Sequence, residues 1–283
     1  MWAVHKPNKS VSFASMPDLR VMLCQCRVIL NKSFLPALGI VFVAILLEIS
    51  SRLELVPSRE FPPISTVLVG LVAEMRCQEF WVSFIGTLQG WAGGLALGVA
   101  IAIPAGIVLG ASDLVFRALR LVIESLRPIP TVALIPLAIL VIGIGQGTKI
   151  ALVAFAVFWP MLIQTIYGVR DVDPVARSCM QSFQISRRYQ VYYLVLPSAA
   201  PYILTGLRLA SSVALIVAVA TELVVGMPGL GASISAAQIS GEPVVQYGYL
   251  LATGILGLVL NLVFLKIERK LLFWHPSQRG GAP

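Results

Sequence analysis

The residues of this chain that could do chemistry are few, and they stand inside long apolar segments. The ionisable side chains singled out within such segments are Glu124, Arg127, Arg208 and Glu222. An ionisable group in an apolar segment is costly to bury, so each of them is a candidate functional residue. Arg127 is suited to an anion, and Glu124 lies three residues before it on one predicted helix. Two interpretations of this pair stay open: mutual neutralisation, or a place in a translocation path.

The other two charges belong to a later apolar segment. Arg208 lies in its first turns, from where the long side chain is expected to reach back to the membrane surface. Glu222 lies near the opposite end, directly before the sequence MPGLG, where it either packs structurally or closes a gate.

Patterns typical of catalysis, metal binding or nucleotide binding are missing. His5 and His275 lie near the ends of the chain without a plausible catalytic partner. Cys24 and Cys26 form a C-x-C pair without the second half that a metal site needs. The glycine-rich stretch IGIGQGTKI lacks the glycine-lysine-hydroxyl order that binds phosphates. We therefore expect no enzyme activity, no metal and no cofactor bound by this chain.

Composition places the chain in a membrane. Hydrophobic residues make up 58% and charged residues only 12% of the 283 positions, against about 25% charged in ordinary soluble domains. The net charge of +8 comes without a basic, aromatic-rich soluble module, so nucleic acid is not an expected partner. Lysines and arginines gather instead in connections, as in polytopic membrane proteins.

Apolar segments long enough to span a bilayer recur along the chain, which predicts an all-α protein of about six transmembrane helices. The predicted spans are Phe34–Ser51, Ser83–Gly110, Leu114–Ile142, Lys149–Val169, Pro201–Val225 and Gln246–Leu265. Glycines at four-residue spacing mark the second span as a helix-packing surface. Pro128, Pro130 and Pro136 interrupt the third span. We expect that span to be kinked and to face the protein interior, where neighbours can satisfy the freed carbonyls.

Positive residues are distributed unequally between the two sides of the predicted helices. One side receives those of residues 1–33, those of the connection after the fourth span, and Lys266, Arg269, Lys270 and Arg279 after the sixth span. The other receives Arg52, Arg59 and Arg76, offset by nearby glutamates. The asymmetry predicts that both termini are cytoplasmic, with 1–33 and 273–283 as cytoplasmic segments and 34–51 as the first transmembrane helix.

The longest predicted cytoplasmic connection runs from Arg170 to about Ala200. Aromatic residues such as Phe183 and Tyr189 accompany Arg187 and Arg188 there. This composition suits a short helix that lies on the membrane surface or docks on a soluble partner, and the residues alone favour neither.

Several ordered motifs resemble the permease subunits of binding-protein-dependent ABC importers of the sulfonate, nitrate and taurine type. They are LPSAAPYILTGLRLA from Leu196, ESLRPIPTVALIPLAILVIGIG from Glu124, GLGASI from Gly229 and FPPISTVL from Phe61. The resemblance covers a core from 80 to 272. It implies the type I importer permease fold, a place in the bacterial inner membrane, a small anionic solute, an external solute-binding protein and a second permease copy or paralogue. ATP and Mg²⁺ would bind a separate ABC ATPase subunit.

The resemblance also implies which residues serve the transport cycle. Those of the ATPase-coupling loop would be Asp173, Pro174, Ser178, Met180, Phe183, Gln184, Arg187, Arg188, Tyr189, Leu196, Pro197, Pro201 and Gly206. Candidates for the translocation path are Glu124, Arg127, Pro130, Pro136 and Glu222. Ser178 to Tyr192 would be the docking element, and Pro197 with Pro201 would mark a break where the chain re-enters the membrane.

The coupling loop departs from the family pattern at two places. The family has Glu-Ala-Ala where this chain has Ser178, Cys179 and Met180, and glycine where it has Gln184. Glycine is favoured where φ is positive, so Gln184 implies either a different turn or local strain. The chain is then either the degenerate, non-transporting member of a heteromeric permease pair or a homodimer served by an adjusted ATPase. Alternatives from other classes are an ion-coupled secondary transporter, for which no inverted repeat is evident, and a membrane scaffold.

Overall fold

The computed structural model describes residues 38–39, 41–53 and 60–273. The chain divides into two compact units, with the division at Ile64. In the first unit residues 41–52 are helical, and the hydroxyl of Ser51 donates to the carbonyl of Phe61 at 2.7 Å. The described part of the predicted first span is therefore a helix. Residues 34–37 and 40 of that span lie outside the described residues.

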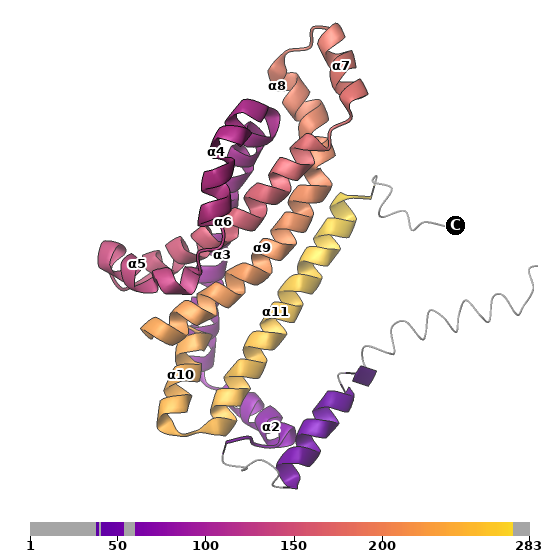
Figure 1. Ribbon diagram of the computed structural model, residues 1–283. Helices are drawn as coiled ribbons and strands as arrows, with labels where there is room; N and C mark the ends of the chain where they lie inside the picture. The colour runs from indigo at the N-terminus through magenta and orange to yellow at the C-terminus, as the bar shows by residue number, and fades with distance from the viewer. Residues whose placement is uncertain (1–37, 40, 54–59, 274–283) are drawn as a thin grey trace, which may run out of the picture. The chain divides into compact units, whose positions relative to one another are not determined.

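The second unit is built from helices alone over its described length (Figure 1). In chain order they are α2 (Ile64–Glu74), α3 (Gln78–Ala111), α4 (Asp113–Leu126), the 3₁₀ turn η1 (Thr131–Leu134), α5 (Ile135–Ile142), α6 (Gln146–Arg170), α7 (Pro174–Ser182), α8 (Arg187–Gln190), the π-helical turn η2 (Val191–Val195), α9 (Leu196–Val225), α10 (Leu230–Ser240) and α11 (Pro243–Leu271).

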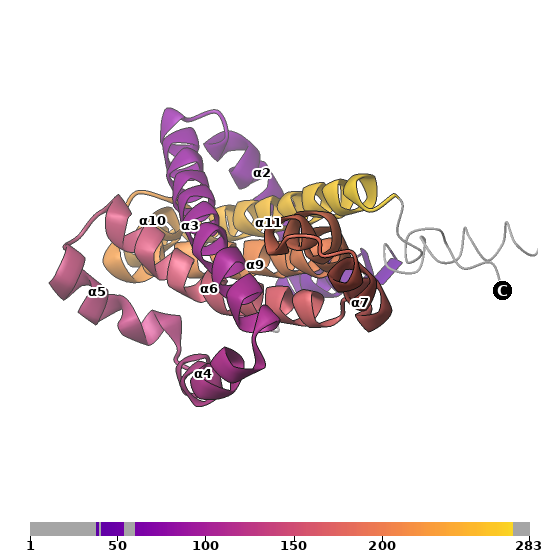
Figure 2. The ribbon, with the colours of Figure 1, turned by 90° about the horizontal axis from the view of Figure 1, so that it is seen from above.

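Four of the described helices are long and apolar enough to cross a membrane. They are α3, α6, the continuous helix from α8 through α9, and α11; the bent pair of α4 with η1 and α5 makes a fifth span if it is counted as one. In Figures 1 and 2, α3, α6 and α9 lie side by side and α11 lies along α9, in agreement with their contacts. Together with the apolar helix of the first unit, these elements form the predicted all-α, polytopic architecture.

A ladder of small residues on α3 sets its distance from α6. A Cβ added at Gly94 would lie 2.4 Å from Val153, and one at Gly98 would lie 2.8 Å from the carbonyl oxygen of Ala154. The ladder contains Gly90, Gly94, Gly98, Ala102, Gly106 and Gly110. Because nothing larger fits, the backbone of α3 packs directly on α6, and the predicted packing surface is confirmed.

The proline-rich span is broken rather than kinked. α4 ends before Pro128, and η1 with α5 continues at an angle of 82°. The amide of Ala133 donates to the carbonyl of Pro130 at 3.0 Å, so the 3₁₀ turn supplies a hydrogen-bond donor for one carbonyl at the break. The expectation that this span faces the interior holds only in part. α4 has no buried residue and α5 has one, Ile135, whereas Phe116, Ile123 and Leu134 are partly buried against the core.

The connection between α6 and α9 contains a helix with defined ends. At the start of α7 the side chain of Asp173 accepts a hydrogen bond from the amide of Val175 at 2.8 Å, and Pro174 occupies the first turn, where its missing N–H is harmless. At its end the amides of Gln184 and Ile185 donate to the carbonyls of Gln181 and Met180 at 2.9 Å and 3.1 Å. This pair of bonds is the Schellman motif.

Gln184 occupies the left-handed position of that motif, with φ of +53°. Glycine is the usual residue there because it has no Cβ. The sequence left two expectations open, a different turn or local strain. The structure shows the second, because Gln184 occupies a turn position that usually requires glycine.

Both ends of the α7–α8 connection are tied to the bundle. Val169, Val172, Val195 and Ala199 form a buried cluster at the ends of α6 and α9. The hydroxyl of Tyr202 donates to Asp171 at 2.9 Å. The connection therefore projects from a fixed base.

Gly98→Ala tests the α3–α6 contact. The added methyl group meets a carbonyl oxygen and Val157, so we expect a destabilisation of about 1–3 kcal/mol from overpacking. Gly254→Ala is the matched control, because nothing lies within 4 Å of its Cβ position. Thermal unfolding of the detergent-solubilised protein measures both. Equal melting temperatures for the two variants would contradict the close approach.

Gln184→Gly tests the strain in the turn. Glycine adopts the left-handed conformation without strain, which stabilises the folded state by about 1–2 kcal/mol. Glycine also loses more backbone entropy on folding, and this offsets about 0.5–1 kcal/mol of that stabilisation. We expect slower amide hydrogen exchange across α7, and faster exchange in the control Gln181→Gly, where glycine interrupts a helix. Faster exchange in both variants would show that the turn is unstrained.

Candidate functional site

The α7–α8 connection presents aromatic side chains to its surroundings. Phe183, at the end of α7, is 81% exposed. Tyr189 and Tyr193 are exposed as well and stack on each other, with ring centroids 6.0 Å apart. Arg187 and Arg188 lie exposed beside them. The structure thus gathers apolar and basic groups on one projecting connection, the chemistry that docking into a groove requires.

The predicted coupling residues divide into three groups. Phe183, Gln184, Arg187, Arg188 and Tyr189 share this exposed connection. Asp173, Pro174, Ser178 and Met180 shape α7, in which the Ser178 hydroxyl donates to the carbonyl of Pro174 at 2.8 Å. Leu196, Pro197, Pro201 and Gly206 belong to α9. A Cβ at Gly206 would lie 2.9 Å from Gln164 of α6, so this glycine serves helix packing.

The break predicted at Pro197 and Pro201 is absent, because one continuous helix runs from Arg187 to Val225. Pro197 lies in the first turn of α9 and Pro201 one turn later. Both prolines therefore lie inside this helix, where each removes one N–H donor from the backbone hydrogen bonds. The π-helical turn η2 directly precedes them and absorbs the local change in winding.

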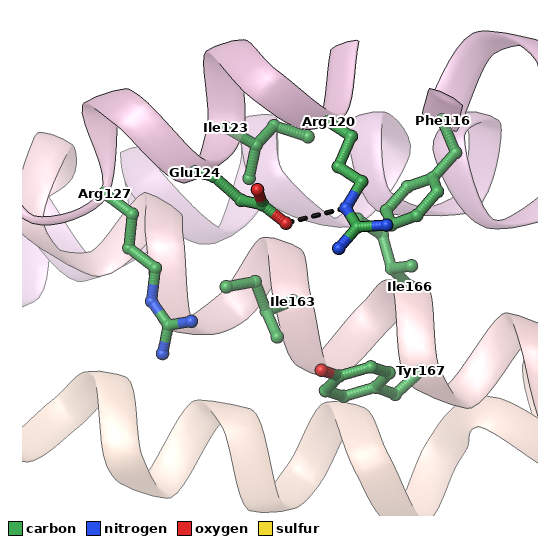
Figure 3. A pocket seen from close by; sticks show the side chains of 8 residues that line it. All are labelled: Phe116, Arg120, Ile123, Glu124, Arg127, Ile163, Ile166 and Tyr167. Atoms are coloured by element: carbon green, nitrogen blue, oxygen red, sulfur yellow. Dashed lines mark hydrogen bonds and ion pairs between the residues drawn. The ribbon is translucent and has the colours of Figure 1, made fainter. Parts of the chain in front are cut away.

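A pocket of about 110 Å³ opens between α4 and α6 (Figure 3). Within it Nε of Arg120 and Oε1 of Glu124 form an ion pair at 2.7 Å. The expected partner of Glu124 was Arg127, and the structure corrects it. Arg127 is the residue at which α4 ends, and Figure 3 shows its guanidinium apart from the pair. The pocket is lined by Phe116, Arg120, Ile123, Glu124, Arg127, Ile163, Ile166 and Tyr167.

Positively charged and apolar side chains line the pocket together. The guanidinium of Arg127 and the ring and hydroxyl of Tyr167 line it from opposite helices (Figure 3). Arg170 lies over the ring of Phe116, 4.0 Å from its centroid, and pairs with Asp113 at 2.9 Å. The pocket thus adjoins the end of α6 from which the α7–α8 connection starts.

The structure does not bring all predicted path residues together. Glu124 and Arg127 share the pocket, whereas Pro130 caps η1 and Pro136 lies in the first turn of α5. Glu222 belongs to a separate cluster at the other end of α9. Arg208 does not simply reach the membrane surface, because its Nε lies 3.6 Å from Glu268 of α11.

Glu222 forms a fully enclosed ion pair with Lys149. Their charged atoms are 2.8 Å apart, and both side chains have no exposed surface. Nζ of Lys149 also donates to the carbonyls of Pro228 at 2.9 Å and Gly86 at 3.2 Å. The second carboxylate oxygen of Glu222 accepts from the hydroxyl of Thr87 at 2.8 Å. Each ammonium proton therefore has an acceptor, as a buried charge requires.

Sequence reasoning missed Lys149 because it stands at the edge of a predicted span. A usable signal was present: Lys149 is in the first turn of α6 and Glu222 in the last turn of α9. Two helices that follow one another through a single connection run antiparallel, so these opposite charges lie at the same level.

Comparison with known proteins identifies the family. Residues 98–271 match the family model described as binding-protein-dependent transport system inner membrane component. The chain is 33% identical over 231 residues to the taurine transport system permease protein TauC of Escherichia coli K12, covering 80% of this chain and 84% of that one. It is 30% identical over 182 residues to the nitrate import permease protein NrtB of Leptolyngbya laminosa, covering 64% and 65% of the two chains.

A solved structure has the same fold. The inward-facing MetNI methionine ABC transporter superposes with a TM-score of 0.60 over 67% of this chain and 96% of that chain, at 17% identity. The family match extends over more than half of the sequence, and the chain itself has four described helices that are long and apolar enough to cross a membrane. This chain is therefore a multi-pass inner-membrane permease component of an ABC importer and belongs to the binding-protein-dependent transport system inner membrane component family.

Proposed function

We propose that this chain forms the translocation path of an importer for a small anion, driven by a separate ATPase that docks on α7 and α8. The observation that carries the proposal is the exposed aromatic and basic surface of that connection, held on a fixed base. Family membership supports an ATP-driven mechanism, and the sequence lacks a phosphate-binding loop of its own. ATP and Mg²⁺ then bind the partner, and this subunit is not an enzyme.

Mechanical coupling follows from the continuity of one helix. The helix from Arg187 to Val225 has 39 residues, which corresponds to about 58 Å at 1.5 Å per residue. Its first turn belongs to the docking surface and its last turn holds Glu222. A displacement of α8 by the ATPase is therefore transmitted along a rigid element to the far end of the bundle.

An anionic solute fits the pocket between α4 and α6. A guanidinium presents paired N–H donors that match the oxygens of a sulfonate or nitrate. Arg127 supplies such a group, since Glu124 is neutralised by Arg120. Relatives named for taurine, an aminosulfonate, and for nitrate support the same chemical class. An external binding protein would deliver the solute, and both termini would be cytoplasmic.

The complete transporter would contain two permeases in a lipid bilayer. No residue of α4 is fully buried, although Val115, Phe116 and Ile123 pack partly against the core. A second copy or a paralogue would close the path. Gln184 keeps the glycine-type turn, which supports a working coupling loop in this chain and favours the homodimer over a degenerate, non-transporting subunit.

Phe183→Ala combined with Arg187→Glu tests the docking surface. Removal of an aromatic anchor typically costs about 2 kcal/mol or more of binding free energy. We therefore expect at least about a tenfold decrease in the amount of ATPase that is extracted together with the permease in mild detergent, and a similar decrease in solute uptake. The control is Phe42→Ala combined with Arg76→Glu, which changes the same exposed residue types outside α7 and α8. Normal ATPase association in the loop variant would refute this docking surface.

Arg127→Gln tests the anion path. Proteoliposomes that contain the permease with its ATPase and binding protein are assayed for uptake of radiolabelled taurine and nitrate. A hydrogen bond to a charged group contributes about 1.5–3 kcal/mol, so we expect at least about a tenfold lower rate. Arg117→Gln, on α4 outside the pocket, is the control. Equal uptake by both variants would exclude Arg127 from the path.

A further inference from the structure

We propose that Lys149 and Glu222 are positioning residues that lock α10 to α3, α6 and α9, so that these elements move as one body during transport. The inference rests on the proposed function, because it concerns the motion of the permease under an ATPase. It assigns a role to the one fully buried ion pair found among the described residues, which the coupling loop and the anion pocket do not use.

The start of α10 is bound through this ion pair. The amide of Gly231 donates to Oε2 of Glu222 at 3.0 Å, and the amide of Leu230 donates to Thr87 at 2.8 Å. The first N–H groups of a helix have no partner within it. A carboxylate beside them also suits the positive end of the helix dipole. Side chains of α9 and α3 thus satisfy the groups that would otherwise let α10 move.

Lys149 fixes the connection that leads into α10. Its Nζ binds the carbonyl of Pro228 in that connection and the carbonyl of Gly86 on α3, as well as Glu222 on α9. One ammonium group of α6 therefore joins three other segments. Because each bond has its own direction, the arrangement specifies a single placement of α10.

Glycines enclose the pair so closely that the surrounding backbone has no alternative position. A Cβ at Gly229 would lie 2.1 Å from the carboxyl carbon of Glu222, and one at Gly90 would lie 2.2 Å from Cδ of Lys149. Gly231 packs in the same way, with its Cβ position 2.3 Å from the carbonyl oxygen of Val219. A shift of α10 would have to break the ion pair or leave a void beside it.

Stability alone does not account for a charged pair at this place. Desolvation of two ions offsets most of their attraction, and apolar residues of similar volume are often as stable. In some proteins a buried polar or ionic group with complete hydrogen bonding serves instead to select one arrangement. We therefore infer that α10 does not act as a separate lid at its end of the bundle.

A disulfide between α3 and α10 tests whether they move together. The hydroxyls of Ser83 and Ser233 are 2.9 Å apart, so Ser83→Cys with Ser233→Cys is introduced after the four native cysteines are replaced by serine. ATP turnover of the complete transporter in lipid nanodiscs is measured before oxidation, after oxidation and after reduction. We expect turnover to change by less than about twofold, since a rigid contact loses nothing when it is cross-linked.

A loss of turnover on oxidation that reduction restores would overturn the inference, because α10 must then separate from α3. The proposed function fails in a different way. A permease that neither assembles with an ATPase nor supports ATP turnover before oxidation would refute the proposed function, and the inference would fall with it.

Lys149→Met combined with Glu222→Met tests whether the pair itself places α10. In the same cysteine background, we expect the yield of the Ser83–Ser233 disulfide to fall at least about fivefold, together with ATP-driven transport, while the helix content stays unchanged. Glu48→Met combined with Arg52→Met removes an exposed ion pair of the first unit and is expected to change neither. A disulfide that forms equally well in both double variants would show that α10 is placed without the pair. A variant that does not fold also contradicts a positioning role, since the pair would then be required for the bundle as a whole.

Discussion

The direct packing of α3 on α6 is the contact on which the rest of this permease depends. Lipid supplies no hydrophobic driving force between helices, so their association relies on close van der Waals contact. Glycines every fourth residue on α3 bring its backbone against Val153, Val157 and Val169 of α6. α9 packs on α6 and also contacts α3. At one end this three-helix core carries the α7–α8 connection, and at the other it encloses Lys149 and Glu222.

The position of each charge along the helices decides its role. Lys149 and Glu222 are enclosed where three helices and the start of α10 meet, and they bind only to each other and to neighbouring protein groups. Arg208 and Glu268 are partly buried between α9 and α11. Arg120 and Glu124 remain accessible at a pocket. The Lys149–Glu222 pair can specify structure. Beside the Arg120–Glu124 pair, in contrast, the guanidinium of Arg127 lines the same pocket and can meet a solute.

The turn at Gln184 shows how backbone hydrogen bonds hold a glutamine in a conformation that glycine usually adopts. The Schellman hydrogen bonds from Gln184 and Ile185 end α7 and direct the chain into α8. They require a left-handed residue, and here glutamine adopts φ of +53°. Phe183, next to it, keeps its exposed position. The surface proposed for the ATPase is thus maintained by backbone hydrogen bonds despite the strain at one residue.

The sequence by itself determined the helical class, the position of most spans, the helix-packing glycines and the importer family, because these follow from the length of apolar segments and from local motifs. It also predicted that Gln184 would be either strained or in a different turn. The tertiary structure was needed to show that Glu124 pairs with Arg120, that Lys149 is the partner of Glu222, that α4 has no fully buried residue and that α9 is continuous through Pro197 and Pro201. The physical reason is that partners and burial depend on which helices lie side by side and at what level, which a single chain of residue types does not record.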